Sequence, residues 1–104
     1  MPSQQKTCFR LYFGLFSKKI GIISKDDFID FCEKHITPCF KSFTIIYALG
    51  FWENTQENTA IVELILNDTF HIQSQIGTIC NAYKTQFYQD CILVSKNAVD
   101  IKFI

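Results

Sequence analysis

The sequence has no excess of charge of either sign, no long apolar run, and few glycines and prolines. Ten basic and ten acidic residues give a formal net charge of zero at pH 7, which argues against a nucleic-acid partner and against a polybasic membrane anchor. No apolar run approaches the roughly 18 residues of a membrane span, and the first residues lack the apolar core of a signal peptide. We therefore expect a cytoplasmic protein without a membrane partner. Four glycines and two prolines indicate no linker or disordered tract.

Apolar side chains, by contrast, are abundant. Hydrophobic residues occupy 48% of the 104 positions, and they include eleven Phe, four Tyr and one Trp. A chain of this length is typical of one domain, so we expect a single domain over residues 1–104. The apolar content exceeds the need of one small core, because a domain of this size hides only about two thirds of the surface of its unfolded chain.

The five cysteines form no Cys-x-x-Cys pair, and their odd number in a cytoplasmic chain indicates reduced thiols that pack as small apolar side chains. Cys32, His35 and Cys39 have the spacing of one helical face and are the candidate set of zinc ligands. Pro38 is expected to end the helix before Cys39, and no fourth ligand is evident, so we expect helix packing and no metal. His71 stands alone near an expected helix start, where a solvated or capping role is favoured.

Apolar periodicity divides the chain into strands and helices. Cys8–Phe16 alternates with the period of a strand, whereas the apolar residues after Ser24 recur at helical spacing as far as Thr37-Pro38. A hairpin with its turn at Asn54–Gln56, a longer helix and two short strands complete the pattern. The expected segments are Ser42–Glu53, Thr59–Leu66, Ile72–Phe87, Asp90–Ser95 and Val99–Phe103. The order β-α-β-β-α-β predicts an α+β ferredoxin-like plait, an antiparallel sheet with two helices on one face.

The expected hairpin strands are apolar on both faces of the sheet. In Thr59–Leu66 the even-numbered residues are expected to face the helices, while Ile61 and Ile65 face away. A half-solvated antiparallel sheet normally alternates apolar with polar residues, and a large apolar patch is unusual on a monomer. We therefore expect subunits to associate through the face that the helices leave open. The alternative is that a fifth strand or the tail, with its apolar residues 101–104, folds over that face.

Short motifs that combine polar with aromatic residues follow one another in the order Gly50-x-Trp52, Glu57-x-Thr59 and Gln89-Asp90-Cys91-Ile92-Leu93-Val94. Their order and spacing resemble those of the small S-adenosylmethionine (SAM) lyases of bacteriophages, a group first described as SAM hydrolases. In that family a Gly-x-aromatic element precedes a Glu that is followed two residues later by Thr or Ser, and a Gln-Asp-Cys-Val-Leu-Val string comes later. With Leu11–Gly14 and Tyr83-Lys84, the motifs also resemble a bacterial family of small proteins of unknown function.

The resemblance implies an enzyme that converts SAM to 5′-methylthioadenosine and homoserine lactone, with SAM as the substrate and no cofactor. The substrate's own carboxylate attacks its γ-carbon, so a protein base is not required. Glu57 is the implied catalytic carboxylate, which holds the substrate's ammonium or its ribose hydroxyls, and Glu63 is the alternative. Aromatic faces are suited to the sulfonium. The implied substrate-binding residues are Trp52, Tyr47, Tyr12, Gly50, Thr59, Gln89 and Asp90.

The resemblance further implies a homo-oligomer, with a trimer favoured and the active site between subunits. For a phage enzyme it implies depletion of SAM in the host cytoplasm, which interferes with restriction and methylation. Two other classes of function remain open, because one fold hosts many functions. The first is a non-enzymatic oligomeric plait that binds a small ligand or a protein partner. The second is a dimeric plait-type oxygenase that acts on an apolar substrate.

Overall fold

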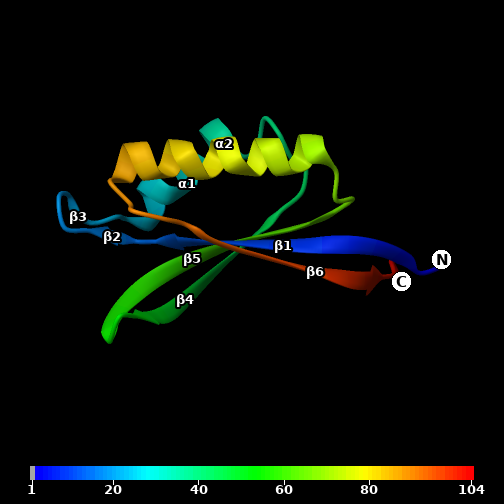
Figure 1. The fold of residues 1–104 in the computed structure, drawn as a ribbon, viewed down its shortest axis with the longest axis horizontal. Coiled ribbons are helices and arrows are strands. Elements are labelled where there is room, and N and C mark those ends of the chain that lie inside the picture. The colour runs from blue at the N-terminus through cyan, green and yellow to red at the C-terminus, as the bar shows by residue number, and fades with distance from the viewer. Residues whose placement is uncertain (1) are drawn as a thin grey trace.

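The computed structural model describes residues 2–104, which form an antiparallel sheet with two helices on one of its faces (Figure 1). The elements in chain order are β1 (Gln4–Gly14), β2 (Phe16–Ser17), β3 (Gly21–Ile22), α1 (Lys25–His35), β4 (Thr44–Trp52), β5 (Thr55–Leu66), α2 (Phe70–Phe87) and β6 (Leu93–Ile101). The main sheet has the strand order β4-β5-β1-β6, and all its neighbouring strands are antiparallel. This arrangement confirms the predicted α+β ferredoxin-like plait.

Each helix begins at a side chain that caps it. The Ser24 hydroxyl accepts a hydrogen bond from the Asp27 amide before α1, at 3.0 Å. The Thr69 hydroxyl accepts one from the Ile72 amide before α2, at 3.1 Å. Each cap satisfies an amide that has no partner inside the helix, and the predicted start of the first helix at Ser24 is confirmed.

The core lies between the helices and the sheet, and its centre is aromatic. Tyr83 of α2 is fully buried, and its ring centroid lies 4.7 Å from that of Phe13 on β1 and 5.0 Å from that of Phe31 on α1. Such pairs add about 0.5–1.5 kcal/mol each beyond the burial of their area. The residues of β5 that were predicted to face the helices are buried in the same core or packed against it: Ala60, Val62, Leu64 and Leu66.

The last part of the chain differs from the prediction. Two strands were expected, Asp90–Ser95 and Val99–Phe103, but the structure has the single strand β6 over Leu93–Ile101. The polar residues in its middle continue the pairing, with Lys96 opposite Phe9 and Asn97 opposite Cys8. The first strand is also longer than predicted and begins at Gln4, because β6 supplies backbone partners to its polar start.

The hairpin of β4 and β5 turns earlier than predicted. Asn54–Gln56 was expected as the turn, but β5 begins at Thr55, and the two residues between the strands are Glu53 and Asn54. Both have a positive φ, 48° and 66°, as a two-residue turn of type I′ requires. This turn matches the right-handed twist of the strands, which allows Trp52 to pair directly with Thr55.

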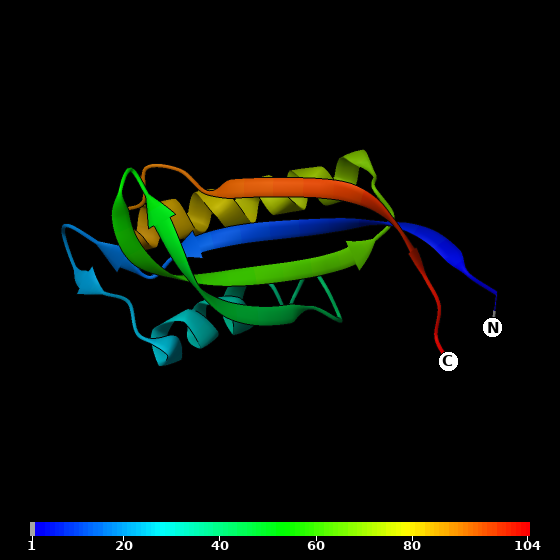
Figure 2. The same cartoon turned by 90° about the horizontal axis from the view of Figure 1, so that it is seen from below.

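The face opposite the helices is open in the single chain, as Figure 2 shows from below. Tyr12 of β1 lies at its centre, between Ile61 of β5 and Leu93 of β6. Beside them the Arg10 guanidinium pairs with the Glu63 carboxylate at 3.0 Å. The C-terminal residues do not cover this face, because Phe103 and the residue after it are exposed. The alternative of a tail folded over the sheet is therefore wrong for this chain.

Between residues 2 and 104, neither helix combines the length and the apolar character that crossing a membrane requires.

Candidate functional site

Gly14, the last residue of β1, is the point at which three of the predicted site residues meet, namely Glu57, Thr59 and Gln89. It pairs with Thr59 of β5, and a methyl group at its Cα would overlap Glu57 Oε1 and lie 2.9 Å from Gln89 Oε1. The two side chains thus occupy the space that a Cβ would take. The structure brings together Glu57 from the hairpin and Gln89 from the segment after α2, which the sequence separates by 32 positions.

Tyr83 of α2 binds this strand end from the side of the sheet that the helices cover. Its hydroxyl donates a hydrogen bond of 2.6 Å to the Gly14 carbonyl, and its ring is fully buried in the aromatic core. Burial raises the pKa of this phenol well above its usual range, and the nearby Glu57 carboxylate raises it further. Tyr83 therefore stays protonated and acts as a permanent donor to Gly14.

The end of α2 orients Gln89. Tyr88 adopts the left-handed conformation with φ 53°, and this reversal lets the Gln89 amide donate to the Lys84 carbonyl at 3.1 Å. The side-chain amide nitrogen of Gln89 then donates to the carbonyls of Phe16 at 2.8 Å and Phe87 at 3.2 Å. Because both donor positions are used, the amide oxygen is the atom left to face Gly14 and Glu57.

The site presents two hydrogen-bond acceptors side by side, here called the acceptor pair. A carboxylate oxygen of Glu57 and the amide oxygen of Gln89 approach the same point above Gly14. Within residues 2–104 neither oxygen accepts a hydrogen bond from the protein. Partial burial raises the pKa of Glu57 from its ordinary value of 4.5. Two acceptors that meet without a donor form a receptor for a group rich in N–H or O–H, such as an ammonium or a diol.

Gly50 and Thr59 extend this site along the hairpin. Gly50 of β4 lies directly opposite Glu57, and Thr59 Oγ1 is 3.0 Å from the point where a Cβ of Gly50 would stand. Trp52 shares this face of the hairpin and is 58% exposed. Tyr12, two residues before Gly14 on β1, points to the same open face. An aromatic surface therefore borders the acceptor pair on the open side of the sheet.

Tyr47 lies apart from the acceptor pair, whereas Asp90 directly follows Gln89. Tyr47 is opposite Ala60, a helix-facing residue, and the Lys25 ammonium of α1 lies 4.5 Å from the centre of its ring. Tyr47 and Thr59 both line a hollow of about 440 Å³ beside the start of α1, so Thr59 is the residue shared by the two regions. Asp90 is exposed on the loop between α2 and β6.

The candidate zinc ligands and the alternative carboxylate are engaged in other ways. Cys32 is buried in the core, the His35 ring stacks on Phe31 with centroids 4.6 Å apart, and Cys39 is exposed beyond the helix. No group of three His, Cys, Asp or Glu residues between positions 2 and 104 is arranged to hold a metal ion. Glu63, the alternative carboxylate, is paired with Arg10.

The sequence did not identify Gly14 and Tyr83 as site residues, although both belong to the motifs that carry the resemblance. A glycine at a strand end and a tyrosine on the apolar stripe of a helix are typical of a turn and of a core. The relevant signal is the polar hydroxyl at a core position, which needs a buried acceptor. Only the fold shows that this acceptor is Gly14.

Comparison with known proteins gives one family and one group of solved structures. The model of the family described as "Protein of unknown function (DUF3574)" matches residues 9–103. No curated protein matches the sequence. A phage SAM lyase in complex with S-methyl-5′-thioadenosine superposes with a TM-score of 0.67 over 94% of this chain and 90% of its own. A phage SAM lyase in the apo state gives 0.72 over 95% and 90%, and both are 11% identical to this chain. At this identity the likeness shows a shared fold.

Proposed function

The chain belongs to the family of proteins of unknown function DUF3574, and we propose that it is a SAM lyase. The observation that carries the proposal is the acceptor pair of Glu57 and Gln89 above Gly14, on a fold shared with phage SAM lyases. One of those lyases is in complex with S-methyl-5′-thioadenosine, the nucleoside that such a reaction releases. SAM supplies the groups that the site lacks, namely an ammonium, a ribose diol and a sulfonium.

The proposed reaction needs no proton transfer. An oxygen of the substrate's carboxylate forms a bond to its γ-carbon, and the bond from the γ-carbon to sulfur breaks with its electron pair on sulfur. The products are neutral methylthioadenosine and homoserine lactone, which keeps the ammonium. Because a carboxylate and a sulfonium lose their charges together, a site that excludes water and folds the methionyl chain favours the transition state.

Each residue of the site has a task in this proposal. Glu57, with Gln89 beside it, holds the substrate ammonium or ribose hydroxyls and fixes the position of the methionyl chain. The Trp52 ring receives the sulfonium, a contact of about 0.5–2 kcal/mol depending on desolvation, and Tyr12 and Tyr47 are the alternatives. Gly50 allows the backbone to approach the adenine closely, and Thr59 lies next to it. Asp90 reaches a substrate that is bound to a neighbouring subunit.

Association of subunits belongs to the same proposal. Trp52 and Tyr12 border the acceptor pair on the open face, so a single chain leaves bound SAM in contact with water. A second copy on this face completes the enclosure, and the assembly that we favour is a trimer with the site between subunits. Such an enzyme lowers the SAM content of the host cytoplasm and thereby limits methylation and restriction.

The experiment that tests the function is incubation with SAM in water labelled with oxygen-18. The expected products are methylthioadenosine and a lactone without label, with label entering homoserine only at the carboxyl group when the lactone opens. Label in the hydroxyl of homoserine would show attack by water at the γ-carbon instead. Binding of SAM without any product would favour the alternative of a non-enzymatic ligand-binding plait.

Glu57→Gln tests the site, with Glu63→Gln as the matched control on the same strand. We expect Glu57→Gln to lower kcat/KM by at least about 100-fold, whereas Glu63→Gln keeps turnover. Wild-type turnover should fall as the pH drops through the raised pKa of Glu57, because only the carboxylate binds the ammonium. An active Glu57→Gln beside an inactive Glu63→Gln would move the site to Glu63.

Folding stability separates loss of the site from loss of the fold. The raised pKa means that folded Glu57 binds its proton more tightly than unfolded Glu57, so its contribution to stability is present at low pH and lost as the pH rises through that pKa. Glu57→Gln should therefore unfold at a higher temperature than wild type at neutral pH, and this difference should disappear below about pH 4. A variant that is inactive because it is misfolded would unfold at a lower temperature instead.

A further inference from the structure

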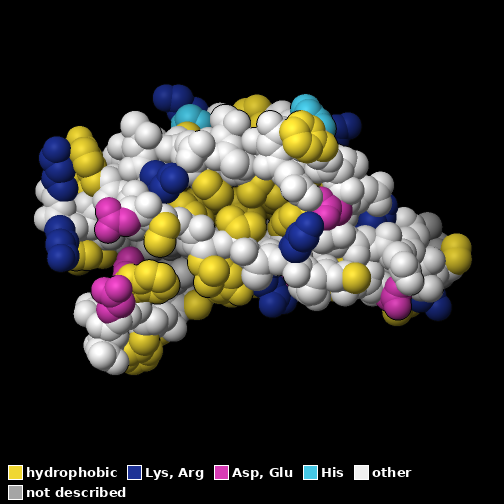
Figure 3. All heavy atoms as spheres, in the orientation of Figure 1, with side chains coloured by type: hydrophobic (Ala, Val, Ile, Leu, Met, Phe, Trp, Pro, Cys, Tyr) yellow, Lys and Arg dark blue, Asp and Glu magenta, His cyan; other side chains and the backbone are white. Residues whose placement is uncertain are grey.

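A second concave site lies on the other side of the sheet, between α2 and β6. It is a groove of about 510 Å³, and Figure 3 shows it as a hollow with a hydrophobic floor. None of its lining residues belongs to the acceptor pair or to Gly14. Its volume falls in the range of pockets that bind small molecules, about 300–1,000 Å³.

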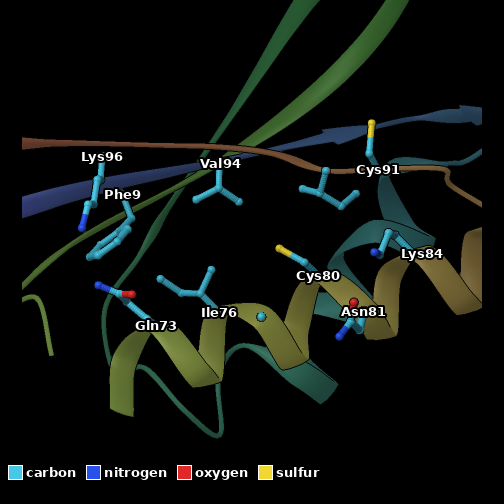
Figure 4. Close-up of a pocket in the computed structure, with 11 residues that line it drawn as sticks. Phe9, Gln73, Ile76, Cys80, Asn81, Lys84, Cys91, Val94 and Lys96 are labelled. Carbon is cyan, nitrogen blue, oxygen red and sulfur yellow. The ribbon is translucent and has the colours of Figure 1, made fainter. Parts of the chain in front are cut away.

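The floor of this groove is apolar and well ordered by the core. Phe9 of β1, Ile76 of α2 and Cys80 of α2 are buried, and Val94 of β6 faces them across the groove (Figure 4). The side of the groove that α2 forms consists of residues three or four positions apart, which make one stripe of the helix. The groove therefore follows this stripe along the helix.

Gly77 keeps the groove open in the middle of that stripe. A Cβ at this position would meet no atom within 4 Å, so neither a turn nor a close approach of the backbone requires glycine here. Glycine inside a helix is less stable than alanine by about 1 kcal/mol. A side chain larger than that of alanine would project into the groove, and its absence leaves room for a ligand.

The charged groups that line the groove have one sign. They are Lys84 and Lys96, and the other polar lining residues are the amides Gln73 and Asn81. The Lys96 ammonium is held by the Asp68 carboxylate at 2.8 Å, whereas Lys84 forms no ion pair within residues 2–104. The groove thus offers an unpaired cation near the C-terminal end of α2 and an apolar floor beside it.

We propose that this groove binds a monocarboxylate with an unbranched apolar chain, in the manner of a medium-chain fatty acid. Lys84 contacts the carboxylate, and the chain lies along Cys80 and Ile76 toward Phe9. A carboxylate matches the unpaired ammonium, and an unbranched apolar chain matches an apolar floor that follows the helix and has no acidic residue in its lining. The proposal does not depend on SAM lyase activity, because the two sites share no residue.

Calorimetric titration with sodium decanoate tests this site. Wild type should bind decanoate at one site per chain, Lys84→Met should weaken the affinity about tenfold, and Gly77→Leu should abolish binding. Lys34→Met, in the last turn of α1, removes a lysine elsewhere and should leave the affinity unchanged. Circular dichroism establishes that the variants are folded, and Gly77→Met, which also projects into the groove and should likewise abolish binding, replaces the leucine variant if that variant is not.

The proposal makes two further distinctions. Decanol, which has the chain without the charge, should bind wild type and Lys84→Met equally. Saturating SAM should leave decanoate binding unchanged. The proposal is overturned if wild type binds no decanoate, if Lys84→Met binds it as tightly as wild type, or if SAM displaces it. A change of the sedimenting mass in Gly77→Leu would also overturn it, because the groove would then be a contact between copies.

Discussion

Gly14 has an unusual position for a glycine, because two polar side chains occupy the space beside its Cα. Its φ is not positive, so the backbone accepts alanine, and the obstacle is the overlap with Glu57 and Gln89. Both obstructing atoms are the ends of side chains, which can swing away. The positions of the Glu57 and Gln89 side chains therefore depend on the absence of a methyl group at residue 14.

We predict that Gly14→Ala folds normally and loses activity. The methyl group displaces the Glu57 carboxylate toward solvent, and a shift of this size costs about 100-fold in kcat/KM. The free energy of unfolding should stay within about 1 kcal/mol of wild type, as measured by urea denaturation. Gly77→Ala, which adds the same methyl group in open space on α2, should keep full turnover. Wild-type turnover in Gly14→Ala would show that Glu57 does not act from this position.

The residues of the candidate site could be predicted only in part. The motifs pointed to Glu57, Gly50, Thr59 and Gln89; the structure places Glu57, Thr59 and Gln89 beside Gly14, and Gly50 opposite Glu57. The face of the sheet on which the Tyr47 side chain lies depends on the register that pairs Tyr47 with Ala60. A sequence that is apolar on both faces does not specify that register.

At the scale of elements, the turn of the β4–β5 hairpin requires two residues with positive φ, and one of its two residues, Glu53, is poorly suited to that conformation. Both turn residues are left-handed; Asn54 adopts this conformation readily, whereas Glu53 adopts it at a steric cost. The strands adjoining the turn carry Gly50, Trp52 and Glu57. The hairpin is thus positioned by its long pairing with β1 and not by the preference of its turn residues.

We predict that Glu53→Gly stabilises the protein by about 1 kcal/mol, which corresponds to a rise of about 4–8 °C in Tm. Glycine adopts a positive φ without steric cost, so the strain at this position is removed. Glu53→Ala is the matched control, because it removes the carboxylate and keeps the left-handed cost, and its Tm should not rise. Equal gains in both variants, measured by calorimetry, would assign the effect to charge instead of conformation.

Element order could be predicted well, and element ends could not. Ser24 with its acidic first turn specified the start of α1, because a cap is a local interaction. The break that was expected inside β6 reflects the polar residues Lys96 and Asn97. Their strand conformation depends on backbone pairing with β1 and on the contact between Lys96 and Asp68, which are remote in sequence.

The whole molecule presents an open sheet face whose apolar centre is Tyr12, Ile61 and Leu93. Its ion pair, Arg10 with Glu63, lies within the same face and is partly exposed, so it contributes little to the stability of the single chain. A surface of this kind is typical of subunit association. The sequence predicted it from alternation, but the number of subunits does not follow from an apolar pattern.

We predict that the protein is an oligomer and that Ile61→Asp dissociates it to the 12.1 kDa chain. A carboxylate at the centre of the face would have to be buried without a partner on association. Ile20→Asp, on the exposed turn between β2 and β3, is the matched control and should keep the assembly. Sedimentation velocity at micromolar concentration measures both variants. A wild-type chain that sediments as a monomer would remove the shared active site from the proposal.

The outermost pairs of β1 and β6 join Gln4 to Ile101, so both chain ends leave the sheet at the same place, away from the hairpin (Figures 1 and 2). An affinity tag or a surface tether on either end is therefore remote from Glu57. The same proximity allows the two ends to be joined by a short peptide, with new ends opened at the exposed turn after β2. The fold thus suits immobilised assays and circular permutation equally.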